Sequence, residues 1–140
     1  MKTYLTKYLV IFALLTVIFT IVFRFFLSYG IDIENASIIL GSAAFYAISM
    51  LFIGWYFGKR DGEYTEVIDT GFKVHFTTYI IHNLISELWF LSGLNSSRES
   101  ITVVHYTAIF WGLGLLLHFL YYMWMRRKSV DGLDDDDLFE

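Results

Sequence analysis

The sequence predicts an all-α integral membrane protein, built as an antiparallel bundle of four transmembrane helices with both termini inside. Hydrophobic residues make up 56% of the 140 residues and aromatic residues 20%, more than a soluble domain of this size can hide. They gather in four apolar runs, each near the roughly 20 residues that a helix needs to cross a hydrocarbon core. No proline interrupts these runs. We expect the bundle to occupy residues 1–125, with helices at about residues 8–29, 36–57, 71–93 and 101–125.

The first run follows a short basic segment and contains one charged residue, Arg24. A cleaved signal peptide is disfavoured, because the run is too long for a signal's apolar region and no A-x-A-like site follows it. Arg24 lies about a turn and a half from the far end of the run, given 3.6 residues per turn. Two interpretations of Arg24 stay open: its side chain extends to the lipid headgroups, or it forms an ion pair inside the membrane.

The second run carries small side chains that let helix backbones approach closely in lipid. Gly54 and Gly58 have the GxxxG spacing, and the fourth run adds another pair of glycines. The predicted helix-packing residues are Gly41, Ala44, Ala47, Gly54, Gly58, Gly112 and Gly114. We expect this surface to pack inside the bundle first and to form a homo-oligomer contact second.

Basic residues are strongly segregated between the two sides of the predicted spans. One side carries only Arg24 and Arg98, whereas the other carries Lys2, Lys7, Lys59, Arg60, Lys73, Arg126, Arg127 and Lys128. The positive-inside rule therefore places both termini and the loop 59–70 in the cytoplasm. Residues 126–140, first basic and then acidic, are expected to be a disordered cytoplasmic tail. The loop and the tail are candidate contacts for a cytoplasmic protein partner.

The composition leaves little room for common catalytic chemistry. Without cysteine, disulfides, thiolate metal sites and cysteine nucleophiles are excluded. Ser86 lies near His82 and Glu87 in sequence, but nothing arranges a nucleophile, a base and an oxyanion hole. The chain has no nucleotide-binding loop, and a nucleic-acid partner is not expected. An enzyme is the less favoured class.

Polar residues concentrate in the hairpin formed by the third and fourth runs. The two helices of an antiparallel hairpin rise equally per residue, so residues whose numbers sum to about 193 should lie level. This rule pairs His75 with His118, His82 with Trp111, and Glu87 with His105. On the third run, His75, Tyr79 and His82 share one helical face, and Asn83 and Glu87 lie further round. Ionisable groups at membrane depth are costly, so each is a candidate site.

The level pairs give two candidate clusters. Near the outer ends, Glu87 and His105 would be joined by Arg24, either as a structural clamp or as a site that handles protons or anchors a ligand. In the inner half, His75 and His118 would either hydrogen-bond across the helices or ligate haem. Directly packed helices are about 8–10 Å apart, which leaves little room for a macrocycle. No cofactor is expected, haem stays open, and no metal is expected because a third level ligand is missing.

The hairpin also resembles a known family. The first helix has the pattern F-x-x-H-x-x-x-Y-x-x-x-N, followed by a tryptophan, and the second has W-G-x-G-L before a histidine. The residues are Phe72, His75, Tyr79, Asn83, Trp89, Trp111, Gly112, Gly114, Leu115 and His118. This pattern is similar to the two-transmembrane (2TM) domain common in Bacteroidetes, found alone or fused to LytS-type sensor histidine kinases. The resemblance implies a module for sensing or regulation in a bacterial inner membrane.

Three functions follow as expectations. The first is a non-enzymatic regulatory, sensory or accessory subunit that works through the hairpin. The second is a haem- or quinone-binding protein that uses His75 and His118. The third is an oligomeric pore or stress-response effector with the small-residue surface of the second helix as its subunit contact. The lipid bilayer is a partner in all three.

Overall fold

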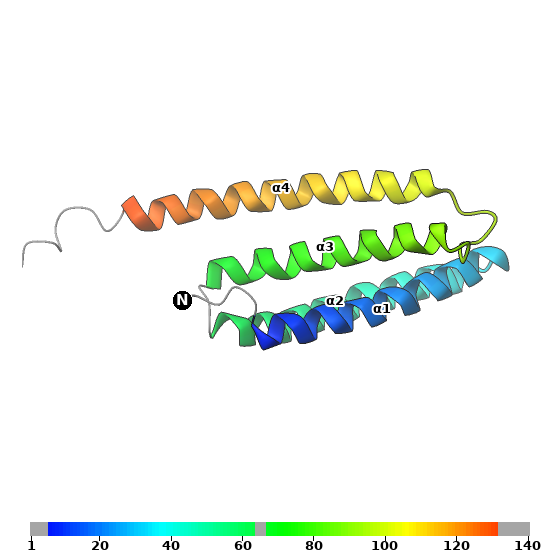
Figure 1. Cartoon of the computed structure of the whole chain (residues 1–140), viewed down its shortest axis with the longest axis horizontal. Helices are drawn as coiled ribbons and strands as arrows, with labels where there is room; N and C mark the ends of the chain where they lie inside the picture. Colours follow the sequence, from blue (N-terminus) through cyan, green and yellow to red (C-terminus); the bar gives the residue numbers. More distant parts are fainter. Residues whose placement is uncertain (1–5, 64–66, 132–140) are drawn as a thin grey trace, which may run out of the picture.

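The computed structural model describes residues 6–63 and 67–131, which form four α-helices. Their bounds are α1 Lys7–Asp32, α2 Ala36–Gly62, α3 Val67–Leu91 and α4 Ile101–Asp131. Successive helices run antiparallel (Figure 1), which confirms the predicted all-α membrane fold. By length and composition, α1, α2 and the segment Ile101–Met125 of α4 can each cross a membrane. Helix α3 is nearly as long but more polar.

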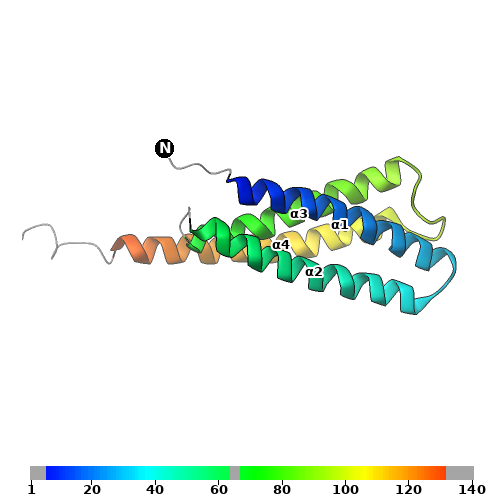
Figure 2. The ribbon, with the colours of Figure 1, turned by 90° about the horizontal axis from the view of Figure 1, so that it is seen from below.

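The polar helix α3 lies in the middle of the molecule. It contacts α1 and α2 on one side and α4 on the other, so its polar groups can face protein instead of lipid (Figure 1). The turn after α3 meets the turn between α1 and α2, where Ser96 Oγ donates a hydrogen bond to Asp32 Oδ1. The α1–α2 turn and the α3–α4 turn therefore lie at the same end of the bundle. Helix α3 runs the length of the bundle alongside its neighbours (Figure 2).

Local sequence explains where the helices begin and end. Thr6 caps α1 by accepting a hydrogen bond from Leu9 N at 3.2 Å. After α3, Gly93 adopts a left-handed φ of 67°, and Leu94 N donates to Trp89 O at 3.1 Å. This is the Schellman arrangement, which requires a residue that tolerates positive φ. Helix α3 therefore ends at Leu91, slightly earlier than the sequence predicted.

At the end of the bundle where α1 begins and α4 ends, the helices reach further than expected, which corrects two predictions. The loop predicted at 59–70 is largely helical, because α2 continues to Gly62 and α3 begins at Val67. Asp61 is buried there and accepts a hydrogen bond from Thr6 Oγ1, which ties the end of α2 to the start of α1. Helix α4 continues past the expected end to Asp131. The acidic residues 132–140 of the predicted tail lie outside the described residues.

The small residues do not form one continuous packing surface. A Cβ added at Gly54 would lie 3.1 Å from Val74 Cγ1, so this glycine allows α2 to approach α3 closely. Gly58 faces the same helix, with Thr70 Cγ2 at 3.6 Å from its added Cβ. The prediction of packing inside the bundle is wrong for Gly41 and Gly114, whose added Cβ would meet nothing within 4 Å. Ala44 and Ala47 are likewise exposed.

Candidate functional site

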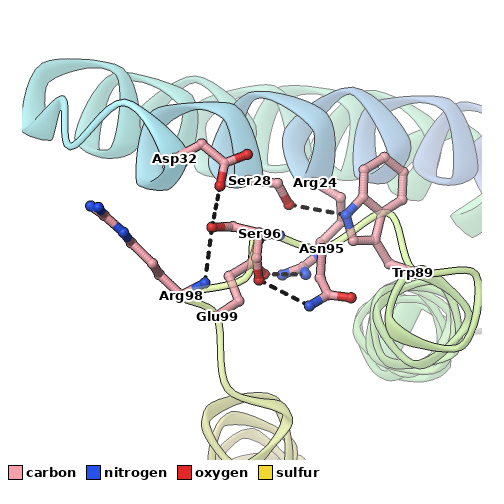
Figure 3. Close-up of polar contacts among 8 residues, drawn as sticks. All are labelled: Arg24, Ser28, Asp32, Trp89, Asn95, Ser96, Arg98 and Glu99. Carbon is pink, nitrogen blue, oxygen red and sulfur yellow. Dashed lines mark hydrogen bonds and ion pairs between the residues drawn. The ribbon is translucent and has the colours of Figure 1, made fainter.

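A network of polar side chains joins α1 to the turn between α3 and α4, at the end of the bundle where α1 and α3 end. Figure 3 shows Arg24, Ser28 and Asp32 on one side of α1, spaced by one helical turn each. Arg24 Nη2 donates to Glu99 Oε2 at 2.5 Å. Trp89 Nε1 donates to Ser28 Oγ at 3.0 Å, and Asp32 accepts from Ser96 as described above. We call this network, Arg24, Ser28, Asp32, Trp89, Ser96 and Glu99, the outer clamp.

The partner of Arg24 differs from the predicted one. Arg24 is almost fully buried and pairs with Glu99, not with Glu87. Its guanidinium also lies 5.5 Å from the ring centroid of Phe90, a cation–π distance. Glu99 comes from the turn before α4, which folds back over the end of α1 and brings the carboxylate to the arginine (Figure 3). A buried cation requires such a partner.

Glu99 also forms a capping-box arrangement with Ser96 within this turn. Its Oε1 accepts from Ser96 N at 3.1 Å, and Ser96 Oγ accepts from Arg98 N at 3.2 Å. Helix α4 begins later, at Ile101. The motif therefore stabilises the turn that carries Glu99, and one carboxylate serves both this turn and Arg24.

Glu87 and His105 meet across α3 and α4, as the level rule predicts. His105 Nε2 lies 2.9 Å from Glu87 Oε1, and about half of each side chain is exposed. The predicted cluster of three residues is thus two separate contacts: an exposed pair that bridges the hairpin and a buried pair that belongs to the outer clamp.

A second polar network crosses the middle of the bundle and links α1, α2 and α3. Thr20 Oγ1 donates to Thr16 O at 2.7 Å and lies 3.0 Å from Tyr46 Oη, which in turn lies 3.2 Å from His82 Nδ1. We call Thr16, Thr20, Tyr46 and His82 the central chain. It lies among aromatic rings: Phe23 stacks on Tyr46 with centroids 4.8 Å apart.

The donors in the central chain can be assigned from its geometry. Because the hydroxyl proton of Thr20 goes to Thr16 O, Tyr46 donates its own proton to Thr20. Tyr46 then accepts from His82, which carries its proton on Nδ1. The chain therefore fixes both the orientation and the tautomer of His82. The imidazole ring also lies beside Trp111, with ring centroids 5.3 Å apart.

Removing the Tyr46 hydroxyl should weaken the bundle measurably. We expect Tyr46→Phe to lower the free energy of unfolding in detergent by about 1–3 kcal/mol, because the Nδ1–H of His82 loses its acceptor at membrane depth. Tyr121→Phe is the matched control, since Tyr121 is 59% exposed. Equal unfolding midpoints for the two variants would contradict the assigned chain.

The inner pair, His75 and His118, is in direct contact. The ring centroids lie 5.2 Å apart in an edge-to-face arrangement. A haem bound by both residues would have its macrocycle between the rings, so these residues do not fit that group. The ring of Phe72 lies beside His118 and in turn packs on Phe119.

Of the remaining predicted residues, Tyr79 and Trp111 join α3 to α4, whereas Asn83 forms a hydrogen bond within α3. Tyr79 Oη donates to Ala108 O at 3.2 Å and packs against Gly112, where an added Cβ would lie 3.0 Å from the hydroxyl. Trp111 packs edge-to-face on Tyr79, with centroids 5.8 Å apart. Asn83 Nδ2 donates to Tyr79 O at 2.7 Å. Gly112 thus serves the predicted close approach of the hairpin helices.

The polar face of α1 was not predicted from the sequence. Residues at every fourth position are buried and face the rest of the bundle: Phe12, Thr16, Thr20, Arg24 and Ser28. Side chains spaced by four share one helical face, so this periodicity was readable in the sequence. It marks the side of α1 that supplies both the central chain and the outer clamp.

The comparisons with known proteins concern the hairpin. The family model described as the 2TM domain matches residues 69–130, which spans most of α3 and α4. This match confirms the resemblance predicted from the C-terminal region. Helices α1 and α2 lie outside the matched range. No curated protein and no solved structure matches the chain.

Proposed function

We propose that this protein acts in the membrane as a non-enzymatic regulatory or accessory subunit. The proposal rests on its 2TM domain at residues 69–130 and on the contacts described above. In this proposal, α4 relays a change within the membrane to a cytoplasmic partner. The observation that carries the proposal is the uneven packing of α4. Within the described residues, α4 contacts no helix other than α3, whereas α3 also contacts α1 and α2.

The attachment of the hairpin supports this role. The outer clamp holds the turn before α4 against α1 through a buried ion pair and hydrogen bonds. Toward the inner end, α4 is held by ring contacts such as that of His75 with His118. A helix held firmly at one end and loosely along its length can tilt about the held end. Such a tilt would displace the opposite end most.

The opposite end of α4 is where a partner would bind. Helix α4 extends beyond the other helices there (Figure 1), and it is continuous to Asp131. The segregation of basic residues supports a cytoplasmic position for this end and for both termini, in a bacterial inner membrane. We propose that the segment 126–140 contacts a cytoplasmic protein, with the α2–α3 connection as a smaller second contact.

Crosslinking in native membranes tests the proposal. We expect the full-length protein, tagged at its N-terminus, to capture one cytoplasmic protein reproducibly. A variant with residues 132–140 replaced by a Gly/Ser segment of equal length should lose it. Arg98→Gln, a change at the other end of the bundle, is the control and should retain it. Identical captures for all three proteins would refute the proposal.

The two other candidate functions have simple readouts on the same purified protein. A Soret band would indicate haem and contradict the direct contact of His75 with His118. Leakage from loaded vesicles would indicate a pore. Gly54 and Gly58 pack against α3, whereas Gly41, Ala44 and Ala47 stay exposed on α2 and would have to supply the subunit contact of a pore.

A further inference from the structure

A groove of about 1000 Å³ lies between α2 and α4, with α3 as its floor. It runs along α2 from Tyr46, in the middle of the bundle, to Glu63 at the inner boundary. Its volume is at the upper end of the roughly 300–1,000 Å³ typical of ligand sites. The central stretch is apolar, with Met50, Leu51 and Val74 among its lining residues. In a membrane, this stretch favours a hydrocarbon chain over water.

The groove also presents polar nitrogens at membrane depth. His75, His118 and Trp111 line it, and none of the three forms a hydrogen bond with another residue in the described part of the chain. An unpaired polar group in hydrocarbon costs several kcal/mol. A pure acyl chain therefore leaves these N–H groups without hydrogen-bond acceptors. An occupant that carries oxygen acceptors along its length can supply them.

The mouth of the groove carries both signs of charge. Lys59 and Glu63 line it, and their spacing of four places both side chains on one side of α2. Lys59 Nζ lies 6.0 Å from the Trp55 ring centroid, and neither charge forms an ion pair with any side chain that the structure describes. A cation beside an anion is complementary to a zwitterion, with phosphate at the lysine and ammonium at the carboxylate.

The depths of these groups in the membrane match the order of phosphate, glycerol esters and acyl chain along a phospholipid. Gly54 contacts Val74, so His75 lies near the level of Gly54. Lys59 is five residues further along α2, which places it about 7 Å closer to the boundary at 1.5 Å per residue. A phosphate at Lys59 would thus place the glycerol esters near His75 and His118, where the imidazole N–H groups can donate to the ester oxygens. The acyl chain would continue to Tyr46.

We propose that this groove binds one phospholipid with a phosphoethanolamine headgroup. Lys59 holds the phosphate, Glu63 the ammonium, and His75 with His118 the ester region. The lipid fills the space between α2 and α4, which do not contact each other in the part of the chain that the structure describes. This inference goes beyond the proposed function, because lipid can bind whether or not a cytoplasmic partner exists.

Lipid retention measures the proposal directly. The protein is reconstituted in vesicles of equal amounts of phosphatidylethanolamine and phosphatidylglycerol, re-extracted, and its bound lipid is quantified by mass spectrometry. We expect one phosphatidylethanolamine per chain. Ala47→Phe, at an exposed residue of the groove wall, should lower retention about tenfold, and Lys59→Gln should do the same, since tenfold corresponds to the loss of one charge-assisted hydrogen bond.

Matched controls lie on the same helix. Ala44→Phe changes an exposed alanine outside the groove lining, and Arg60→Gln removes a charge that lies over the Tyr56 ring. Both should retain the lipid as the original protein does. Equal loss in the variants and controls, preferential retention of phosphatidylglycerol, or a lipid-free dimer that covers the groove would each overturn the proposal.

Discussion

Glu99→Gln should lower the free energy of unfolding by about 3 kcal/mol or more, which is the range for removing one partner of a buried ion pair. The change leaves the Arg24 guanidinium buried without a counter-charge. Both side chains are about 95% buried, with 5% and 6% exposure, so water cannot replace the lost carboxylate. Denaturant-induced unfolding in detergent micelles, followed by tryptophan fluorescence, measures the change.

Two other acidic residues provide controls at the same end of the bundle. Glu34 pairs with Arg98 at the surface, and Glu87 contacts His105 with about half of each side chain exposed. Exposed pairs contribute about 0–1 kcal/mol, so Glu34→Gln and Glu87→Gln should each shift the unfolding midpoint only slightly. If Glu87→Gln destabilised the protein as much as Glu99→Gln, the assignment of Arg24 to Glu99 would be wrong.

The contacts of Glu87 could be predicted from the sequence, whereas those of Glu99 could not. Equal rise along two antiparallel helices correctly predicted that His75 would meet His118 and that Glu87 would meet His105. This rule uses only the position of one short turn. It also explains why the hairpin, with its polar face on α3, was the best-predicted part of the site.

The partner of Arg24 could not be predicted by the same reasoning. Glu99 lies in the turn before α4, and its capping-box spacing accounted for it locally. Only the path of the turn over the end of α1, set by Gly93 and the contact of Ser96 with Asp32, brings Glu99 to Arg24. The central chain was missed for a related reason: hydropathy treats Thr16 and Thr20 as minor interruptions of an apolar run, although their spacing marks a buried face.

The packing of α4 on α3 alone also had no sequence signal. All four apolar runs suggested a closed bundle, yet the described part of α4 contacts no helix other than α3. The reason is visible at the contact itself. Tyr79 reaches across to Ala108 O beside Gly112, so α4 approaches α3 where a side chain is missing, and the groove takes the place of a contact with α2.

Gly112→Leu should separate α4 from α3. A Cβ at this position would lie 3.0 Å from Tyr79 Oη, so the larger side chain must displace the tyrosine and break its hydrogen bond to Ala108. Packed helix axes are separated by about 8–10 Å depending on the side chains between them, and we expect α4 to move outward by about 2 Å. Spin labels on cysteines introduced at Ile48 of α2 and Leu113 of α4, both exposed, report this movement as a longer α2–α4 distance, because α2 stays packed on α3. The chain has no native cysteine that would take up label.

Gly114→Leu is the matched control, because an added Cβ at Gly114 meets nothing within 4 Å. It introduces the same side chain two residues away and should leave the label distance unchanged. If the two variants gave the same distance, Gly112 would not set the approach of α4 to α3. A specific increase for Gly112→Leu would also separate His118 from His75, since both histidines meet across the same two helices. Gly112 would then be established as the point at which α4, the helix that the proposed relay depends on, is attached to α3.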